Sequence, residues 1–116
     1  MTANNPRIIY KICRSPEWEA AEQAGAFRGS PDDRRDGFIH FSTGAQLPGT
    51  LAKYFAGEAG LIVVAVDAAR LGEALRWEPS RDNALFPHLY AELSLDAVLW
   101  SRPLASIIND LKQLSQ

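Results

Sequence analysis

The longest apolar run of the sequence, Leu61 to Val66, constrains the fold most strongly. A strand that is apolar at every position is typically covered on both faces, so this run predicts the central strand of a sheet. The run is far too short to cross a bilayer. With 116 residues, the chain has the size of one domain and can bury a core without disulfides or a structural metal. We therefore expect a single domain over residues 1–116, with a flexible N-terminal tail at residues 1–6.

The charges of the sequence are nearly balanced, with 12 basic and 14 acidic residues and a net charge of -2. No basic block is long enough to bind bulk nucleic acid. The N-terminal segment lacks the apolar core of a signal peptide, which favours a cytoplasmic protein without a membrane partner. The single cysteine, Cys13, excludes an internal disulfide and is expected to be a small buried hydrophobe. The oligomeric state stays open.

The spacing of apolar and turn-forming residues predicts short strands interspersed with helices. We expect strands over Ile8–Cys13, Phe38–Phe41, Leu61–Val66, Leu75–Glu78, Leu89–Leu93 and Ala97–Trp100. We expect helices from Ser15 to Gly25, from Thr43 to Phe55 and from Pro103 through Leu114, with loops at Arg28–Gly37 and Pro79–Pro87. The close-set charges of the first loop face solvent or line a pocket. About five or six strands and three helices without strict alternation favour an α+β domain with a mixed sheet.

The first candidate site lies between Gly37 and Thr43. Strand alternation turns Phe38, His40 and Ser42 to one face, just before a helix N-terminus. This position suits a ligand, because free N–H groups of the helix bind anions and an imidazole binds sugar hydroxyls. Alternatively, His40 is a hydrogen-bonded core histidine. For Thr43, helix capping is favoured over ligand binding.

A second polar face is formed by His88, Tyr90 and Glu92. If their strand neighbours the strand of His40, both histidines line one cleft. His88 or Glu92 then supplies a general acid or base, and Tyr90 a ring that stacks on the ligand. Alternatively, these side chains form the solvent face of an edge strand.

Arg76, Trp77 and Glu78 bring a guanidinium, a large flat ring and a carboxylate to another predicted strand. Arg76 and Glu78 share a face of that strand. They form either a surface ion pair or the polar wall of a pocket.

Several mechanisms find no support in the sequence. The two histidines lack a cysteine pair or a third ligand at metal-binding spacing, so we expect no metal. The sequence contains no GxGxxG, GxxxxGK or GxSxG motif. Rossmann-type dinucleotide binding, P-loop chemistry and the α/β-hydrolase mechanism are therefore not expected.

Several segments together resemble a known family. They are Ile9-Tyr10-Lys11-Ile12, Trp18, Gly29-Ser30, Asp36 to Thr43, Phe55-Ala56-Gly57, Leu75-Arg76-Trp77-Glu78 and Phe86-Pro87-His88-Leu89-Tyr90. On these residues the chain is identified as a member of the small bacterial family called domain of unknown function 952. The resemblance implies an ADP-ribosyltransferase-like fold, in which a split, strongly bent sheet binds NAD in a cleft.

The resemblance also implies roles for individual residues. In histidine-type members of that fold, a His-x-Ser/Thr motif clamps the ribose and nicotinamide of NAD, a tyrosine stacks on the nicotinamide, and a glutamate often assists transfer. His40 and Ser42 resemble the clamp, with Tyr90 or Tyr54 as the stacking ring and Glu92 or Glu78 as the carboxylate. The expected catalytic residues are His40, Glu92, Glu78 and His88, and the expected ligand-binding residues are His40, Ser42, Thr43, Tyr10, Tyr54, Arg76, Trp77 and Tyr90. A related reading uses Arg34, Arg35 and Arg76 to hold a phosphate, as in the RNA phosphotransferase branch of the fold.

Three classes of function follow. The favoured one is an enzyme that acts on NAD, as a possible substrate, or on an ADP-ribosylated substrate. The second is a sensor that binds a small molecule or nucleotide in the same cleft without turnover. The third is an interaction or structural protein in which the polar residues form a buried network.

Overall fold

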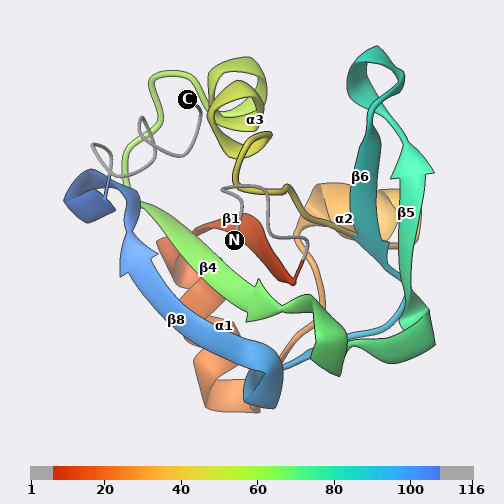
Figure 1. The fold of residues 1–116 in the computed structure, drawn as a ribbon. Helices are drawn as coiled ribbons and strands as arrows, with labels where there is room; N and C mark the ends of the chain where they lie inside the picture. Colours follow the sequence, from red (N-terminus) through yellow and green to blue (C-terminus); the bar gives the residue numbers. More distant parts are fainter. Residues whose placement is uncertain (1–6, 108–116) are drawn as a thin grey trace.

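The computed structural model describes residues 7–107 (Figure 1). The predicted tail at residues 1–6 and the part of the predicted C-terminal helix beyond residue 107 lie outside the described residues. Within them, the chain forms a small α+β domain, as predicted. The expected mixed sheet is wrong, because every strand pairing in residues 7–107 is antiparallel.

The strands form three small sheets. The first contains β1 (Ile8–Arg14), β4 (Leu61–Asp67) and β8 (Val98–Pro103), and the second contains β3 (Ile39–His40), β6 (Leu85–Leu89) and β5 (Leu75–Pro79). The third pairs β2 (Ala26–Phe27) with β7 (Leu93–Ser94). The helices are α1 (Ser15–Ala24), α2 (Pro31–Asp36) and α3 (Leu47–Tyr54), and short 3₁₀ turns occupy Ala68–Arg70, Gly72–Ala74, Arg81–Asn83 and Leu95–Ala97. Residues 104–107 are helical as well, so the helix predicted from Pro103 begins directly after β8.

Strand β4 is the central strand of its sheet, which confirms the prediction from its apolar run. It pairs with β1 on one side and with β8 on the other. The side chains of Val63, Val64 and Val66 are fully buried. They divide between two core clusters, so both faces of the strand are covered.

The first two sheets meet at a single bridge between Tyr10 of β1 and Ser42, just after β3. The amide of Tyr10 donates to the carbonyl of Ser42 at 2.8 Å, and the amide of Ser42 donates back at 2.9 Å. Beyond this bridge the hairpin of β5 and β6 stands away from the first sheet (Figure 1). The division between the sheets leaves space beside β1, and the candidate site lies there.

Helix α2 replaces the loop that was predicted over residues 28–37, so that prediction is wrong. Ser30 caps the helix by accepting from the amide of Asp33 at 3.3 Å, and the Asp33 carboxylate accepts from the Ser30 amide at 2.9 Å. Pro31 stands in the first turn, and Gly37 ends the helix with a φ of 89°. The sequence Ser-Pro-Asp-Asp followed by Gly37 is therefore typical of a short capped helix. The many charged residues of the segment suggested a loop instead.

Strand β6 also differs from the prediction, which placed a loop up to Pro87 and a strand over residues 89–93. Proline usually interrupts a strand. Here Pro87 is paired with Trp77 inside the hairpin, and its carbonyl accepts from the amide of Phe41 at 3.0 Å. The strand ends at Leu89, so His88 lies on it while Tyr90 and Glu92 follow it.

The predicted capping box before α3 forms, since Thr43 and Gln46 exchange side-chain bonds of 3.0 and 3.2 Å. The helix itself begins only at Leu47. Helix α1 ends at Gly25, as predicted, with a φ of 84°. The hydroxyl of Ser15, the first residue of this helix, donates to the carbonyl of Gly60. No helix in the described residues is long and apolar enough to cross a membrane.

Candidate functional site

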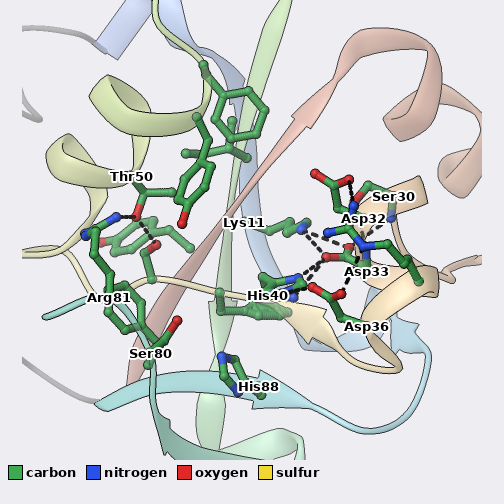
Figure 2. A pocket seen from close by; sticks show the side chains of 18 residues that line it. Lys11, Ser30, Asp32, Asp33, Asp36, His40, Thr50, Ser80, Arg81 and His88 are labelled. Carbon is green, nitrogen blue, oxygen red and sulfur yellow. Dashed lines mark hydrogen bonds and ion pairs between the residues drawn. The ribbon is translucent and has the colours of Figure 1, made fainter. Parts of the chain in front are cut away.

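A cavity of about 280 Å³ opens between β1, α2, α3 and the hairpin of β5 and β6 (Figure 2). Its wall combines charged, hydroxyl and aromatic side chains. The lining residues are Tyr10, Lys11, Ile12, Ser30, Asp32, Asp33, Arg35, Asp36, His40, Phe41, Ser42, Thr50, Tyr54, Phe55, Ser80, Arg81, Phe86 and His88. The charges of the segment before Gly37 thus line a pocket, which is the alternative that the sequence left open.

Asp33 is buried in this wall, where it contacts several polar groups, and 2% of its surface is exposed. Its carboxylate accepts from Lys11 Nζ at 2.8 and 3.0 Å, from the His40 amide at 3.1 Å and from the Ser30 amide. Its Oδ1 also lies 2.6 Å from Nδ1 of His40. Helix α2 places Asp33 there because the residue sits at the third position of the capped first turn.

The environment of Asp33 has opposing effects on its ionisation. Burial raises the pKa of a carboxyl group, whereas the hydrogen bond from His40 and the charge of Lys11 lower it. The lowering contributions dominate and hold the pKa of Asp33 well below its ordinary value. Asp33 is therefore a fixed negative charge beneath the cavity.

The imidazole of His40 is held between two carboxylates. Nδ1 contacts Asp33, and Nε2 lies 3.0 Å from Oδ2 of Asp36. Both nitrogens donate at once only when the ring carries two protons. The hydrogen bond from Arg35 is the largest cause of a lowered pKa at Asp36, and the charge of His40 contributes as well. The His40 ring therefore has a defined orientation on the cavity wall.

His88 lies directly opposite His40 in the ladder of β3 and β6, and their ring centroids are 5.6 Å apart. The prediction that neighbouring strands bring both histidines into one cleft is confirmed. Nδ1 of His88 lies 2.8 Å from Oε1 of Glu78, which also accepts from the Tyr90 hydroxyl at 2.7 Å. Phe38 stacks on the His88 ring at 4.1 Å. Each histidine is thus oriented by a carboxylate at its Nδ1.

The second ring nitrogen of His88, Nε2, makes no hydrogen bond within residues 7–107. It is not fully enclosed either, because Trp18 Nε1 is the only fully buried, unpaired side-chain nitrogen or oxygen in those residues. His88 lines the cavity, and 5% of its surface is exposed.

On the other side of the cavity lie Thr50, Ser80 and Arg81 (Figure 2). Ser42 Oγ and Thr50 Oγ1 are 2.9 Å apart, and Nη1 of Arg81 donates to the same Thr50 oxygen at 3.2 Å. Ser42, predicted to hold a ribose, is thus joined to Thr50 and only 4% exposed. The predicted binding residues Tyr10 and Tyr54 also line the cavity.

Arg35, one of the three arginines expected to hold a phosphate, lines the cavity too, whereas the remaining predicted site residues do not. Glu92 pairs with Arg28 at 3.3 Å beside a second, shallower hollow that also includes Arg34 and Tyr90. Arg76 lies 5.0 Å from the Tyr90 ring, Trp77 is 37% exposed, and Thr43 caps the turn before α3. Glu78 stands behind His88 rather than on the wall.

Five charged lining residues were missed as site residues: Lys11, Asp32, Asp33, Asp36 and Arg81. The helix pattern around Ser30 indicated Asp33, since the side chain at the third helical position of a capping box turns back to the amide of the cap. Nothing in the sequence pattern pointed to Lys11, which lies on a strand and is 6% exposed, or to Arg81.

A model of the family described as "Protein of unknown function (DUF952)" matches residues 12–101. The chain is 49% identical to protein CC0527 from Caulobacter crescentus, and the crystal structure of that protein superposes with a TM-score of 0.81 over 83% of this chain and 84% of that one. A solution NMR structure of CC0527 gives 48% identity and a TM-score of 0.75 over 84% of each chain. A search of curated proteins found no match. These names state no activity, so function is argued from the site.

Proposed function

The chain belongs to the family of proteins of unknown function DUF952, and from this premise we propose that its cavity binds a nucleotide of the NAD or ADP-ribose class and cleaves the bond between ribose and base. The observation that supports this proposal is the His40 ring, fixed between Asp33 and Asp36 on the cavity wall. Both nitrogens of the ring are bonded to carboxylates, and the carboxylate of Asp36 retains lone pairs that can accept from a ribose hydroxyl. His40 and Asp36 are each about one third exposed, so a ligand reaches them.

The charge of the acidic wall suits the chemistry of glycosidic cleavage. When the bond from the ribose carbon to the nicotinamide nitrogen breaks, its electron pair leaves with nicotinamide and positive charge develops on the ribose. A carboxylate beside the ribose stabilises that charge. The resemblance suggested Glu92 or Glu78 for this role, but Asp36 lines the cavity and those two residues do not. We assign the role to Asp36.

His88 supplies the group that activates the attacking water. Glu78 holds its Nδ1, and its Nε2 makes no hydrogen bond within residues 7–107. As the water oxygen bonds to the ribose carbon, Nε2 takes up the proton that the water releases. For a transfer reaction, an acceptor hydroxyl takes the place of this water. Tyr54, which is 58% exposed on the cavity rim, provides a ring for stacking on the base.

Calorimetric titration of the purified protein with NAD, ADP-ribose and nicotinamide tests the binding, and chromatography of released nicotinamide tests the reaction. His40→Ala should weaken NAD binding at least tenfold and abolish release. Glu92→Gln is the matched control, because Glu92 is exposed and lies away from the cavity. Melting temperatures establish that each variant is folded. Unchanged NAD affinity in a folded His40→Ala protein, or no binding by the wild type, contradicts the proposal.

One observation favours the second candidate, a sensor without turnover. Neither Glu92 nor Glu78, the carboxylates that the resemblance assigns to transfer, lines the cavity. The cavity volume of about 280 Å³ is slightly below the roughly 300–1,000 Å³ typical of small-molecule sites, so the cavity fits part of a dinucleotide. Binding of ADP-ribose that depends on His40, with no nicotinamide released from NAD, supports the sensor over the enzyme.

A further inference from the structure

Arg81 differs from the other cations of the cavity in its partners. Lys11 is paired with Asp33, and Arg35 is paired with Asp32 and Asp36. Among the described residues, no carboxylate pairs with Arg81, whose bonds go to the neutral oxygens of Thr50 and Gln46. Its positive charge is therefore available to an anion that enters the cavity.

The guanidinium of Arg81 is nevertheless held firmly in place. Nη1 donates to Thr50 at 3.2 Å, Nη2 donates to the Gln46 carbonyl at 3.4 Å, and the group lies 4.9 Å from the Phe86 ring. These two bonds use only part of the five N–H donors of an arginine. A planar group held in this way retains donors for a second, bidentate partner.

Gly49 in α3 allows the guanidinium to lie close to the helix backbone. A Cβ at residue 49 would lie 3.0 Å from Nη2 of Arg81. On its other side, Arg81 is fixed by the hairpin turn, in which Asp82 and Asn83 adopt φ values of 57° and 61°. Such left-handed residues are what a tight turn between two strands requires. The position of Arg81 therefore depends on both α3 and the turn of the hairpin.

We propose that Arg81, held in place by Thr50, forms with the hydroxyl of Ser80 a subsite for a phosphate group of the ligand. In Figure 2 these residues lie across the cavity from Asp33 and Asp36, with His40 between the two groups. The cavity therefore has a cationic side and an acidic side. An anionic phosphate binds at Arg81, and a ribose hydroxyl binds at the Asp36 carboxylate beside His40. This inference rests on the proposed function for the position of the ribose. The subsite adds a preference for phosphorylated nucleosides and sugars over unphosphorylated ones.

The test compares AMP with adenosine, and ribose 5-phosphate with ribose, by calorimetric titration. In the wild type, each phosphorylated ligand should bind at least tenfold more tightly than its partner. Arg81→Gln should remove that preference and leave adenosine binding unchanged. Gly49→Ala, which keeps the charge but displaces the guanidinium, should reduce the preference as well. Arg34→Gln, at an exposed arginine outside this cavity, should have no effect.

The outcomes separate this inference from the proposed function. An equal preference for AMP in folded wild-type and Arg81→Gln proteins overturns the phosphate subsite, even if NAD binds. Arg81-dependent binding of ribose 5-phosphate without any binding of NAD or ADP-ribose supports the subsite and overturns the proposed function. If no ligand of the panel binds, both are wrong.

Discussion

The carboxylate of Asp33 joins Nζ of Lys11, 22 residues earlier on β1, to Nδ1 of His40, seven residues later on β3. Lys11 and Asp33 are both almost fully buried, whereas His40 reaches the cavity. The carboxylate therefore compensates a buried cation and orients an accessible imidazole at the same time. A substitution of Asp33 should therefore affect both the buried ion pair and the orientation of His40.

Asp33→Asn should destabilise the protein by about 3–5 kcal/mol, because it leaves the Lys11 ammonium buried without a counter-charge. The double variant with Lys11→Met should lose much less than the sum of the two single variants, since it removes both buried charges. Urea unfolding of the four proteins measures these values. Additive losses would show that Asp33 and Lys11 do not stabilise each other.

Acid should destabilise the protein through Asp33. Its pKa is lowered in the folded protein, whereas in the unfolded chain it is about 3.9, so the unfolded state takes up the proton first. The stabilisation is complete above the unfolded pKa and is lost progressively as the pH falls through and below about 4. Unfolding free energies at a series of pH values, for wild type and Asp33→Asn, provide the measurement. A variant with the same acid dependence as the wild type contradicts this assignment.

Gly29→Ala should be more damaging than Gly25→Ala, although both glycines have positive φ values. At Gly25 no atom lies within 4 Å of the added Cβ, so the cost is the backbone strain of about 1–2 kcal/mol. At Gly29 the added Cβ would lie 2.8 Å from Cβ of Asp33, which must then move away from His40. Urea unfolding gives the stabilities, and the NMR signal of the Nδ1 proton of His40 reports the contact. Retention of that signal in Gly29→Ala argues against the mechanism.

Glu78→Gln should lower the pKa of Tyr90. The hydrogen bond to Glu78 is the largest cause of the raised pKa of Tyr90, because the phenol donates to a carboxylate that repels the phenolate. Without that negative charge, the pKa should return toward about 10. An ultraviolet titration of tyrosinate formation, with Tyr90→Phe to identify the signal, tests the expectation. An unaltered Tyr90 titration would exclude the contact in solution.

Cys13 should not react with thiol reagents in the native protein. Burial raises the pKa of its thiol to about 12, and only 1% of its surface is exposed. Alkylation by iodoacetamide at neutral pH should therefore proceed only as fast as the protein unfolds. Addition of urea above the unfolding midpoint serves as the positive control. Rapid labelling under native conditions would contradict the burial of Cys13.

Local patterns predicted the elements that depend on neighbouring residues. The apolar run from Leu61 identified β4, and alternation placed Phe38 and His40 together, as their 4.6 Å ring contact confirms. The predictions were wrong where a residue type is compatible with two kinds of secondary structure. Charged residues suggested a loop where Ser30 caps a helix, and Pro87 suggested a break where a strand continues.

The sequence by itself determined the α+β class, the position of the central strand and the choice of the two histidines as candidate site residues. These conclusions depend on periodicity and propensity, which are properties of short segments. Only the tertiary structure decided which charges surround those histidines. Asp33 and Arg81 belong to the site because β1, α2, α3 and a hairpin converge on one cavity, and such contacts join residues far apart in the chain. It also placed Glu92 outside that cavity, since β6 ends at Leu89 and the polar alternation beyond it no longer follows a strand.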